Sequence, residues 1–165
     1  MAWVCRAGKN GKAHRLFLDS KLVALGRQYV DDLGPLPADR KAFVEHVKAL
    51  ARAAGGPTTP SSLGHIAQTL FRFVHVMHEG DWVLYPATTV DGQVYFGRVG
   101  GPYRYGDKSD SEYPHQRAVV WLKSLPRSEL PSGLFKEISA FHPFYEIKRN
   151  LKSIDRLLGN LAQNT

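Results

Sequence analysis

The sequence contains almost no cysteine and no long hydrophobic run. Cys5 is the only cysteine among 165 residues, so it cannot form an internal disulfide, and we expect it to be a small buried thiol. No apolar run approaches the ~20 residues that a membrane-spanning helix requires. The N-terminus also lacks a basic segment followed by an apolar one, which is the pattern of a secretory signal. These absences predict a cytoplasmic protein with no membrane partner.

Several catalytic and cofactor-binding motifs are missing as well. The sequence has no Gly-x-Ser-x-Gly, and the glycines at positions 97, 100 and 101 match neither the dinucleotide-binding pattern nor the P-loop. His75 and His78 stand three residues apart on an expected helix, but no cysteine or carboxylate at ligand spacing accompanies them. We therefore expect no metal site, no cofactor and no nucleophilic catalysis.

Acidic residues are scarce in the N-terminal part of a basic chain. The whole sequence carries a net charge of +7. Residues 1–27 contain six Lys or Arg residues and one Asp, which gives a net charge of +5. A cluster of this kind suits an anionic partner such as nucleic acid, although a solvated basic face has the same composition.

Two apolar segments in the middle of the chain predict a β-hairpin. Residues 82–85 and 94–99 are rich in the aromatic and branched side chains that favour strands. Asp91 and Gly92 lie between these segments. An Asp-Gly pair favours a two-residue hairpin turn, because both central positions of that turn need positive φ.

The segment after the hairpin, residues 100–105, is rich in glycine and tyrosine and predicts a loop. Tyr103 and Tyr105 flank Arg104 there, so the loop offers two aromatic faces and a guanidinium for stacking on a base. Composition alone favours a place in the core or in strand pairing for most aromatic residues of such a domain. The other ring systems with a polar group include Trp3, Tyr29, Trp82, Tyr85 and Trp121.

The remaining segments predict helices and short strands. Residues 38–54, 61–78 and 149–161 repeat apolar residues at helical spacing. Further strands are expected at 2–7, 22–25, 117–122 and 144–147, a strand or a turn of helix at 13–18, and a short helix at 131–139. Five or six strands with two helices inserted together predict an α+β fold, in which helices pack on a curved, mostly antiparallel sheet or small barrel.

The order of these motifs resembles the PUA-like domain, related to EVE and YTH domains, at the N-terminus of Mrr-like, modification-dependent restriction proteins. The resemblance covers about residues 2–148. It rests on the early Trp strand, Val-Ala-Leu-Gly at 23–26, Phe-Arg-Phe-Val at 71–74, the Gly-Asp strand at 79–86, the Gly-Arg-Val strand at 94–99, the Tyr-x-Tyr segment at 101–105 and the strand at 117–122. It implies a pseudo-barrel, with a reader domain at 1–148 and a C-terminal helix or linker to a missing effector domain at 149–165.

The resemblance also implies a reader of nucleic acid rather than a catalyst. In related domains a modified base is extruded from DNA, or bound in RNA, within an aromatic-lined pocket. Carried over to this chain, the base pocket or its rim consists of Trp3, Tyr29, Tyr103, Tyr105 and Trp82. The phosphate-binding residues are Arg6, Lys9, Lys12, Arg15 and Arg104. The family often has Trp directly after the Val-Ala-Leu-Gly strand, and Arg27 replaces it here, which changes the expected composition of the pocket.

These observations predict a non-catalytic DNA-binding module that recognises a modified base for a restriction system. Its expected partners are double-stranded DNA and a nuclease domain or subunit. An RNA-binding module of the same fold is one alternative. A metal-dependent nuclease is another, because Glu146 and Lys148 form the Glu-x-Lys pattern that helps to hold Mg²⁺ in such enzymes. A protein-interaction domain without a nucleic-acid ligand is the third.

Overall fold

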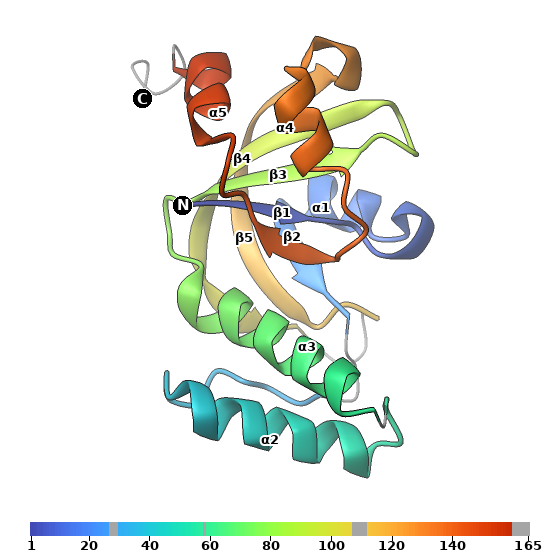
Figure 1. The fold of residues 1–165 in the computed structure, drawn as a ribbon, viewed down its shortest axis with the longest axis vertical. Coiled ribbons are helices and arrows are strands. Elements are labelled where there is room, and N and C mark those ends of the chain that lie inside the picture. The colour runs from blue at the N-terminus through green and yellow to red at the C-terminus, as the bar shows by residue number, and fades with distance from the viewer. Residues whose placement is uncertain (27–29, 58, 107–111, 160–165) are drawn as a thin grey trace.

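The computed structural model describes residues 1–26, 30–57, 59–106 and 112–159. It has the predicted α+β architecture, in which helices pack around a curled sheet (Figure 1). The strands are β1 (Ala2–Cys5), β2 (Leu22–Leu25), β3 (Trp82–Ala87), β4 (Gln93–Tyr105), β5 (His115–Pro126) and β6 (Phe144–Glu146). The helices are α1 (His14–Asp19), α2 (Arg40–Ala53), α3 (Pro60–Phe71), α4 (Ser132–Glu137) and α5 (Leu151–Leu158). Shorter turns are η1 (Lys9–Gly11), η2 (Arg72–Val76, a π-helical turn) and η3 (Arg127–Glu129).

The sheet forms a half-barrel with one open side. Its strands follow the order β2-β5-β4-β3-β1-β6. β1 and β3 run parallel, and the other neighbouring pairs are antiparallel. The curl brings β2 near the end of β1, so that Cys5 Sγ lies 3.8 Å from the carbonyl oxygen of Ala24. We call the open side, between the edge strands β2 and β6, the seam.

Alternating residues of β3 belong to two hydrophobic clusters on opposite faces of the sheet. Val83 and Tyr85 join the first cluster, to which α2 and α3 also contribute. Trp82 and Leu84 join the second cluster, which includes buried residues of α4 and α5. Figure 1 shows the consequence: α2 and α3 lie on one side of the sheet, and α4 and α5 lie on the other.

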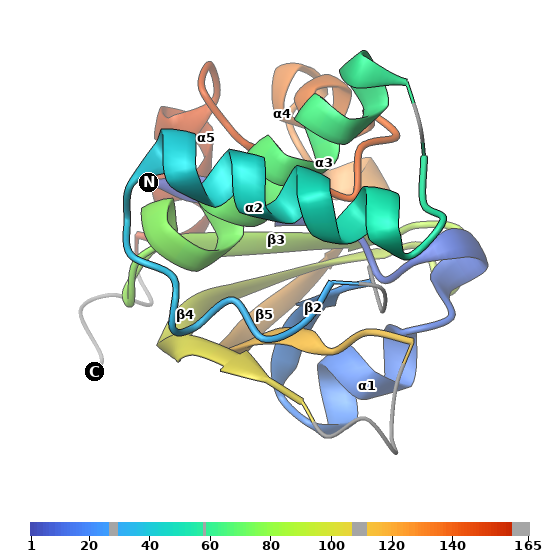
Figure 2. The same cartoon turned by 90° about the horizontal axis from the view of Figure 1, so that it is seen from below.

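The two long helices that the sequence predicts are confirmed, and each begins with a side-chain cap. The Asp39 carboxylate accepts a hydrogen bond from the N–H of Ala42 at 3.0 Å. The Thr59 hydroxyl accepts one from the N–H of Ser62 at 3.4 Å, and Pro60 occupies the first turn of α3. Figure 2 shows α2 and α3 running across the same side of the sheet. The far end of α3 widens into the π-helical turn η2.

The turn between β3 and β4 is longer than predicted. Ala87 pairs with Gln93, so residues 88–92 connect the strands. The carbonyl oxygen of Ala87 accepts hydrogen bonds from the N–H groups of both Val90 and Asp91, which closes a wider turn. The Asp91 carboxylate then accepts a hydrogen bond from the N–H of Gln93 at 2.9 Å. The predicted two-residue turn is wrong because Asp91 caps the start of β4 instead of occupying the centre of a tight turn.

Residues 100–105 continue β4 and do not form the predicted loop. Tyr103 pairs with Arg117 on β5, after a register shift that accommodates the glycine-proline stretch. The buried Arg117 side chain holds this irregular segment, because its Nε donates to the carbonyl oxygen of Gly101 at 3.0 Å. Its Nη1 donates to two carbonyl oxygens of the η2 region, at 3.0 and 2.9 Å. The Arg117 side chain, which is distant in the sequence, therefore decides the conformation of this segment.

The remaining elements agree with the sequence or resolve its ambiguity. Residues 14–19 form a helix, where the sequence allowed a strand or a helical turn. The short helix α4 and the C-terminal helix α5 are found where they were predicted. Cys5 is buried, as expected of a structural thiol. Across the described ranges, no helix has the length and apolar character needed to cross a bilayer.

Candidate functional site

The loop between β1 and α1, residues 6–13, brings glycine and cationic residues to the seam. Gly8 and Gly11 have φ angles of 72° and 70°, a backbone conformation that favours glycine. The N–H of Gly11 donates to the carbonyl oxygen of Gly8 at 3.2 Å, and the N–H of Ala13 donates to that of Ala7 at 2.8 Å. The loop therefore has a defined, compact shape.

Tyr113, just before β5, packs against this loop. A Cβ atom on Gly8 would lie 2.0 Å from Tyr113 Oη, and a Cβ on Gly26 would lie 3.9 Å from two of the ring carbons. Burial raises the pKa of Tyr113, the Glu112 charge raises it further, and Lys12 opposes both effects. The neutral phenol thus lies between the end of β1 and the end of β2, and only glycine at position 8 leaves room for it.

A cavity of about 270 Å³ opens between the loop and the end of β2. Leu25 of β2 and Leu70 of α3 provide apolar lining, and Tyr113 contributes an aromatic wall. Thr69 of α3 adds a hydroxyl group on a side chain that is buried. An apolar pocket with one ring and a few polar groups is a typical binding site for a small flat ligand.

A second cavity, of about 530 Å³, lies on the other side of the same loop. The two cavities share Arg6, Gly8, Lys9 and Pro143 and therefore meet at one rim. The second volume falls within the ~300–1,000 Å³ of ordinary small-molecule sites. Phe141 also lines this cavity. We call these two cavities and their shared rim the seam site.

Phe141 is the most exposed large hydrophobic side chain among the described residues, with 95% of its surface accessible. The segment that carries it is tied to Arg6, whose Nε donates to the carbonyl oxygen of Ala140 at 2.8 Å and whose Nη2 donates to that of Ile138 at 3.0 Å. Figure 1 shows the β1–α1 loop (dark blue) beside the chain between α4 and β6 (red-orange). Arg6 is therefore an anchor between two loops, and its predicted contact with phosphate stays a prediction.

Three more of the predicted phosphate-binding residues lie on the loop or in the first turn of α1. Lys9 and Arg15 are exposed and form no ion pair within the described part of the chain. Lys12 is also exposed and lies 3.3 Å from the Glu112 carboxylate. An exposed pair of this kind contributes little and is easily exchanged for another anion. The loop and the first turn of α1 thus present a positively charged surface.

Tyr103 and Tyr105 of β4 lie elsewhere. The Tyr103 hydroxyl is 2.7 Å from His115 Nδ1, and Tyr105 packs on the same histidine with ring centroids 5.5 Å apart. Arg104 donates to Gln116 Oε1 at 2.8 Å. Tyr103 and Arg104 line a separate cavity of about 340 Å³ over β2, β4 and β5. The structure does not bring these residues together with the aromatic residues of β1 and β3.

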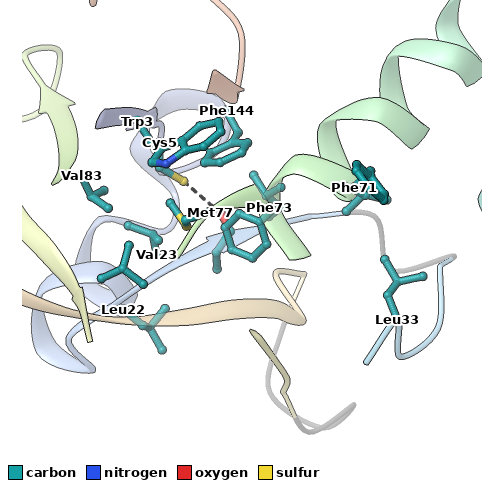
Figure 3. Packing of buried hydrophobic residues seen from close by; sticks show 14 of the residues in the cluster. Trp3, Cys5, Leu22, Val23, Leu33, Phe71, Phe73, Met77, Val83 and Phe144 are labelled. Carbon is teal, nitrogen blue, oxygen red and sulfur yellow. Dashed lines mark hydrogen bonds between the residues drawn. The ribbon is translucent and has the colours of Figure 1, made fainter. Parts of the chain in front are cut away.

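Trp3 and Trp82 belong to the hydrophobic core, which corrects their assignment to an open base pocket. Trp3 is completely buried and stacks on Phe144 with ring centroids 4.9 Å apart (Figure 3). Its indole N–H donates to Asp81 Oδ2 at 2.9 Å. Trp82 lies in the other cluster, with the Arg98 guanidinium 3.6 Å from its ring centroid. The pleat of the sheet separates the two rings, because it directs them to opposite faces.

A hydrogen-bonded network supports the second cavity. Tyr85 lines this cavity from β3, and its hydroxyl lies 2.8 Å from His14 Nδ1. The Tyr95 hydroxyl donates to Asp91 Oδ2 at 2.6 Å, and the same oxygen lies 3.8 Å from His14 Nε2. Burial, followed by the Asp91 charge, raises the pKa of Tyr85, and burial with the Asp91 hydrogen bond raises that of Tyr95 to about 12. Both phenols are therefore neutral near pH 7, and Tyr85 forms part of the cavity wall.

Comparison with known families gives a match over most of the chain. A family model described as a domain of unknown function (DUF8426) matches residues 3–142. The chain belongs to this family. The matched range contains all of β1 except Ala2, the whole β1–α1 loop and β2 to β5, so most of the seam site lies inside the DUF8426 domain. A search of curated proteins found no match.

The Glu-x-Lys pattern lies just beyond the range that matches DUF8426 and lines neither cavity of the seam site. Glu146 and Lys148 line a surface cavity together with Glu137. Glu137 is already engaged, because its Oε1 accepts hydrogen bonds from the N–H groups of Lys148 and Arg149 and its Oε2 accepts one from Asn150 Nδ2. Among the described residues, no group of three His, Cys, Asp or Glu side chains is placed to hold a metal ion.

Two aromatic residues of the DUF8426 seam site were not predicted from the sequence, and the structure does not test the prediction for a third. Tyr113 and Phe141 both lie outside any predicted element. The signal for Phe141 was an aromatic residue in a polar Ser-Ala-Phe-His-Pro stretch without apolar neighbours at strand or helix spacing. Tyr29, a predicted pocket residue, and Arg27, which replaces the tryptophan that the family often has, lie outside the described residues.

Proposed function

We propose that this domain reads a modified base in double-stranded DNA, without catalysis, as the specificity module of a restriction system. The observation that carries the proposal is the seam site, in which two cavities meet at the cationic rim formed by Arg6 and Lys9. The proposal includes a PUA-like relationship and a nuclease domain or subunit as partner. Both rest on the motif order in the sequence.

The smaller cavity fits the chemistry of an extruded base. Tyr113 offers a ring for stacking, which is worth about 1–3 kcal/mol per base and offsets the few kcal/mol of unpairing. Thr69, which lines the same cavity, would offer a hydroxyl to the polar edge of the base. Leu25 and Leu70 form an apolar niche for an added methyl group. A base without that group would leave part of the niche unfilled, which provides the selectivity.

The charges around the rim fit the backbone of the nucleic acid. Lys9, Lys12 and Arg15 are exposed on one loop and the turn that follows it. Phosphate contacts release counterions, so binding should fall steeply as the salt concentration rises. Arg104 is assigned to the separate cavity on β4 and β5, and we do not include it in the primary contact.

RNA is the second candidate ligand, because a single-stranded base reaches the same cavity without unpairing. We favour duplex DNA because the exposed Lys9 and Phe141 side chains line the same cavity, where a duplex would contact them beside the extruded base. The metal-dependent nuclease is not favoured, since Glu137 beside Glu146 is occupied by backbone and amide hydrogen bonds.

The experiment that tests this function compares matched oligonucleotides. Duplexes with cytosine, 5-methylcytosine, 5-hydroxymethylcytosine, adenine or N6-methyladenine at one position, and a single-stranded RNA, are titrated at several salt concentrations with and without Mg²⁺. We expect tighter binding to one modified duplex and no cleavage. Equal affinity for all the DNAs would rule out modified-base reading.

Two variants of the aromatic wall make the test specific. Tyr113→Ala should abolish the preference for the modified duplex, while Tyr113→Phe keeps the ring and should retain it. Glu146→Gln tests the nuclease alternative, because only Mg²⁺-dependent cleavage that this variant loses would support it. Thermal unfolding of each variant, followed by circular dichroism, shows whether the fold is intact.

A further inference from the structure

Phe141 has no packing role that explains it. Its side chain is 95% accessible, although burying a phenylalanine contributes about 1.5–3 kcal/mol. Single exposed apolar residues are common on protein surfaces. This one, however, lines the larger cavity of the seam site and lies two residues from Pro143 on the shared rim. Its position at a candidate binding site distinguishes it from an ordinary surface residue.

The protein holds the backbone around Phe141 in place while leaving the ring free. Arg6 donates hydrogen bonds to the carbonyl oxygens of Ala140 and Ile138, and the Arg6 N–H donates to the carbonyl oxygen of Pro143 at 2.9 Å. The Arg6 guanidinium also lies 5.6 Å from the centroid of the Phe141 ring, within the range of a cation–π contact. The ring is therefore presented to solvent on an anchored segment with a positive charge beside it.

A duplex from which one base has been extruded requires a side chain that fills the gap in its base stack. Extruding a base leaves an apolar gap between the neighbouring base pairs, and proteins fill such gaps with inserted Phe, Leu, Ile or Met side chains. The insertion site must lie beside the pocket that receives the base. In this chain, the cavity with Tyr113 and the exposed Phe141 share the rim formed by Arg6 and Pro143.

We propose that Phe141 is a wedge that enters the base stack of duplex DNA and fills the gap left by the base extruded into the seam site. This inference rests on the proposed function and adds the residue that stabilises the open duplex. Arg6 acts as the positioning residue, because it sets the backbone of the wedge segment through the Ala140 and Ile138 carbonyl oxygens.

Insertion of Phe141 into the base stack predicts a result that a general surface contact with DNA does not. Phe141→Ala should weaken binding to a fully paired modified duplex by about 10-fold or more, in line with the loss of one stacking contact. The loss should be much smaller on a duplex whose modified base lies opposite an abasic site, because part of the unpairing cost is then removed from the DNA itself. Phe141→Trp keeps a ring and should bind like the natural chain.

Base extrusion is followed directly with 2-aminopurine placed next to the modified base, because the fluorescence of this analogue rises when it loses a stacked neighbour. We expect the rise with the natural chain and a reduced rise with Phe141→Ala at saturating protein. Leu151→Ala is the matched control, since Leu151 is an exposed apolar residue on α5, and it should change neither affinity nor fluorescence. Since the Phe141 ring is exposed, Phe141→Ala should unfold at the same temperature as the natural chain.

The outcomes separate the two proposals. If the natural chain prefers a modified duplex but Phe141→Ala binds the paired duplex equally well, the wedge is wrong and the reader stands. An equal loss on the paired and the abasic duplex also overturns the wedge, because it indicates a general contact. If the natural chain shows no preference among the duplexes, or binds single-stranded RNA more tightly than any of them, the DNA reader itself fails.

Discussion

The interior of the half-barrel and its seam use aromatic residues in opposite ways. Inside the half-barrel, Trp3 stacks on Phe144, and Phe73 packs edge-to-face on the Phe144 ring with ring centroids 5.2 Å apart. Other protein atoms therefore cover the faces of these rings. At the seam, Tyr113 forms a cavity wall and Phe141 is almost fully exposed. An aromatic residue can bind a ligand only where the fold leaves a face free, and residue type alone does not reveal this.

Two phenylalanines three positions apart in the sequence differ in this way. Phe144 is the first residue of β6, where it pairs with Cys5 and points into the core. Phe141 precedes the strand, in a segment whose carbonyl oxygens are bound by the Arg6 side chain. The same side chain is thus structural in one case and available in the other.

The largest effect is expected from removing an interior ring. Trp3→Ala should lower the free energy of unfolding by about 3–5 kcal/mol, because it leaves a cavity in the core and removes one of the hydrogen bonds to the Asp81 carboxylate. Phe141→Ala should change it by less than about 0.5 kcal/mol. Urea denaturation of both variants checks the difference. Similar losses for the two would contradict the division into structural and available rings.

A smaller effect is expected from the glycine that makes room for Tyr113. Gly8→Ala places a methyl group 2.0 Å from Tyr113 Oη on a backbone with φ of 72°, and should cost about 2 kcal/mol or more. Gly64→Ala is the matched control, because nothing lies within 4 Å of its Cβ position in α3. It should stabilise the protein by about 0.4–1 kcal/mol through helix propensity and reduced freedom of the unfolded chain. Chemical denaturation measures both changes.

A pH-dependent effect is expected from the carboxylate behind Trp3. Burial alone would raise the pKa of Asp81, but hydrogen bonds from the His78 N–H, the Trp3 indole and the Met1 ammonium group outweigh it and lower the pKa. A lowered pKa in the folded state stabilises the protein at pH values above the unfolded pKa, and this stabilisation is lost as the pH falls through the folded value.

Asp81→Asn should therefore cost about 1–3 kcal/mol near pH 7 and much less at strongly acidic pH. Unfolding by urea at a series of pH values between 7 and about 2 tests this. Asp155→Asn removes an exposed carboxylate on α5 and serves as the control. A constant difference between Asp81→Asn and the natural chain at every pH would contradict the linkage.

The smallest effect on stability is expected at the cationic rim. Lys9→Ala should leave unfolding unchanged and reduce the salt slope of DNA binding by about 1. Lys152→Ala removes an exposed charge of the same type on α5 and should leave the slope unaltered. Titrations at three or more salt concentrations compare them. Equal slopes for both variants would remove Lys9 from the contact surface.

Elements with strong local patterns could be predicted from the sequence. The two long helices follow from apolar residues at helical spacing and from Asp39 and Thr59 at their starts. The exceptions depend on distant partners. The segment that contains Tyr103 is a strand because Arg117 binds the carbonyl oxygen of Gly101. No local pattern contains that information.

The candidate site was predicted in part. The basic N-terminal loop was expected to bind phosphate, and the structure places Lys9 at the rim of both cavities. The expected aromatic residues of the pocket were wrong for Trp3 and Trp82, because the pleat and the core decide their exposure. Tyr113 was missed because it meets Gly8 only after the chain has folded through more than a hundred intervening residues.

The buried thiol of Cys5 has a practical consequence. Burial raises the pKa of this thiol well above its ordinary range, despite its contact with the carbonyl oxygen of Ala24, so it should not react with maleimides in the folded protein. A cysteine introduced at an exposed position, as in Lys152→Cys, would then be the single reactive site. The natural chain is therefore suited to carrying one dye at a chosen place, and the seam can be observed by fluorescence without first removing a native cysteine.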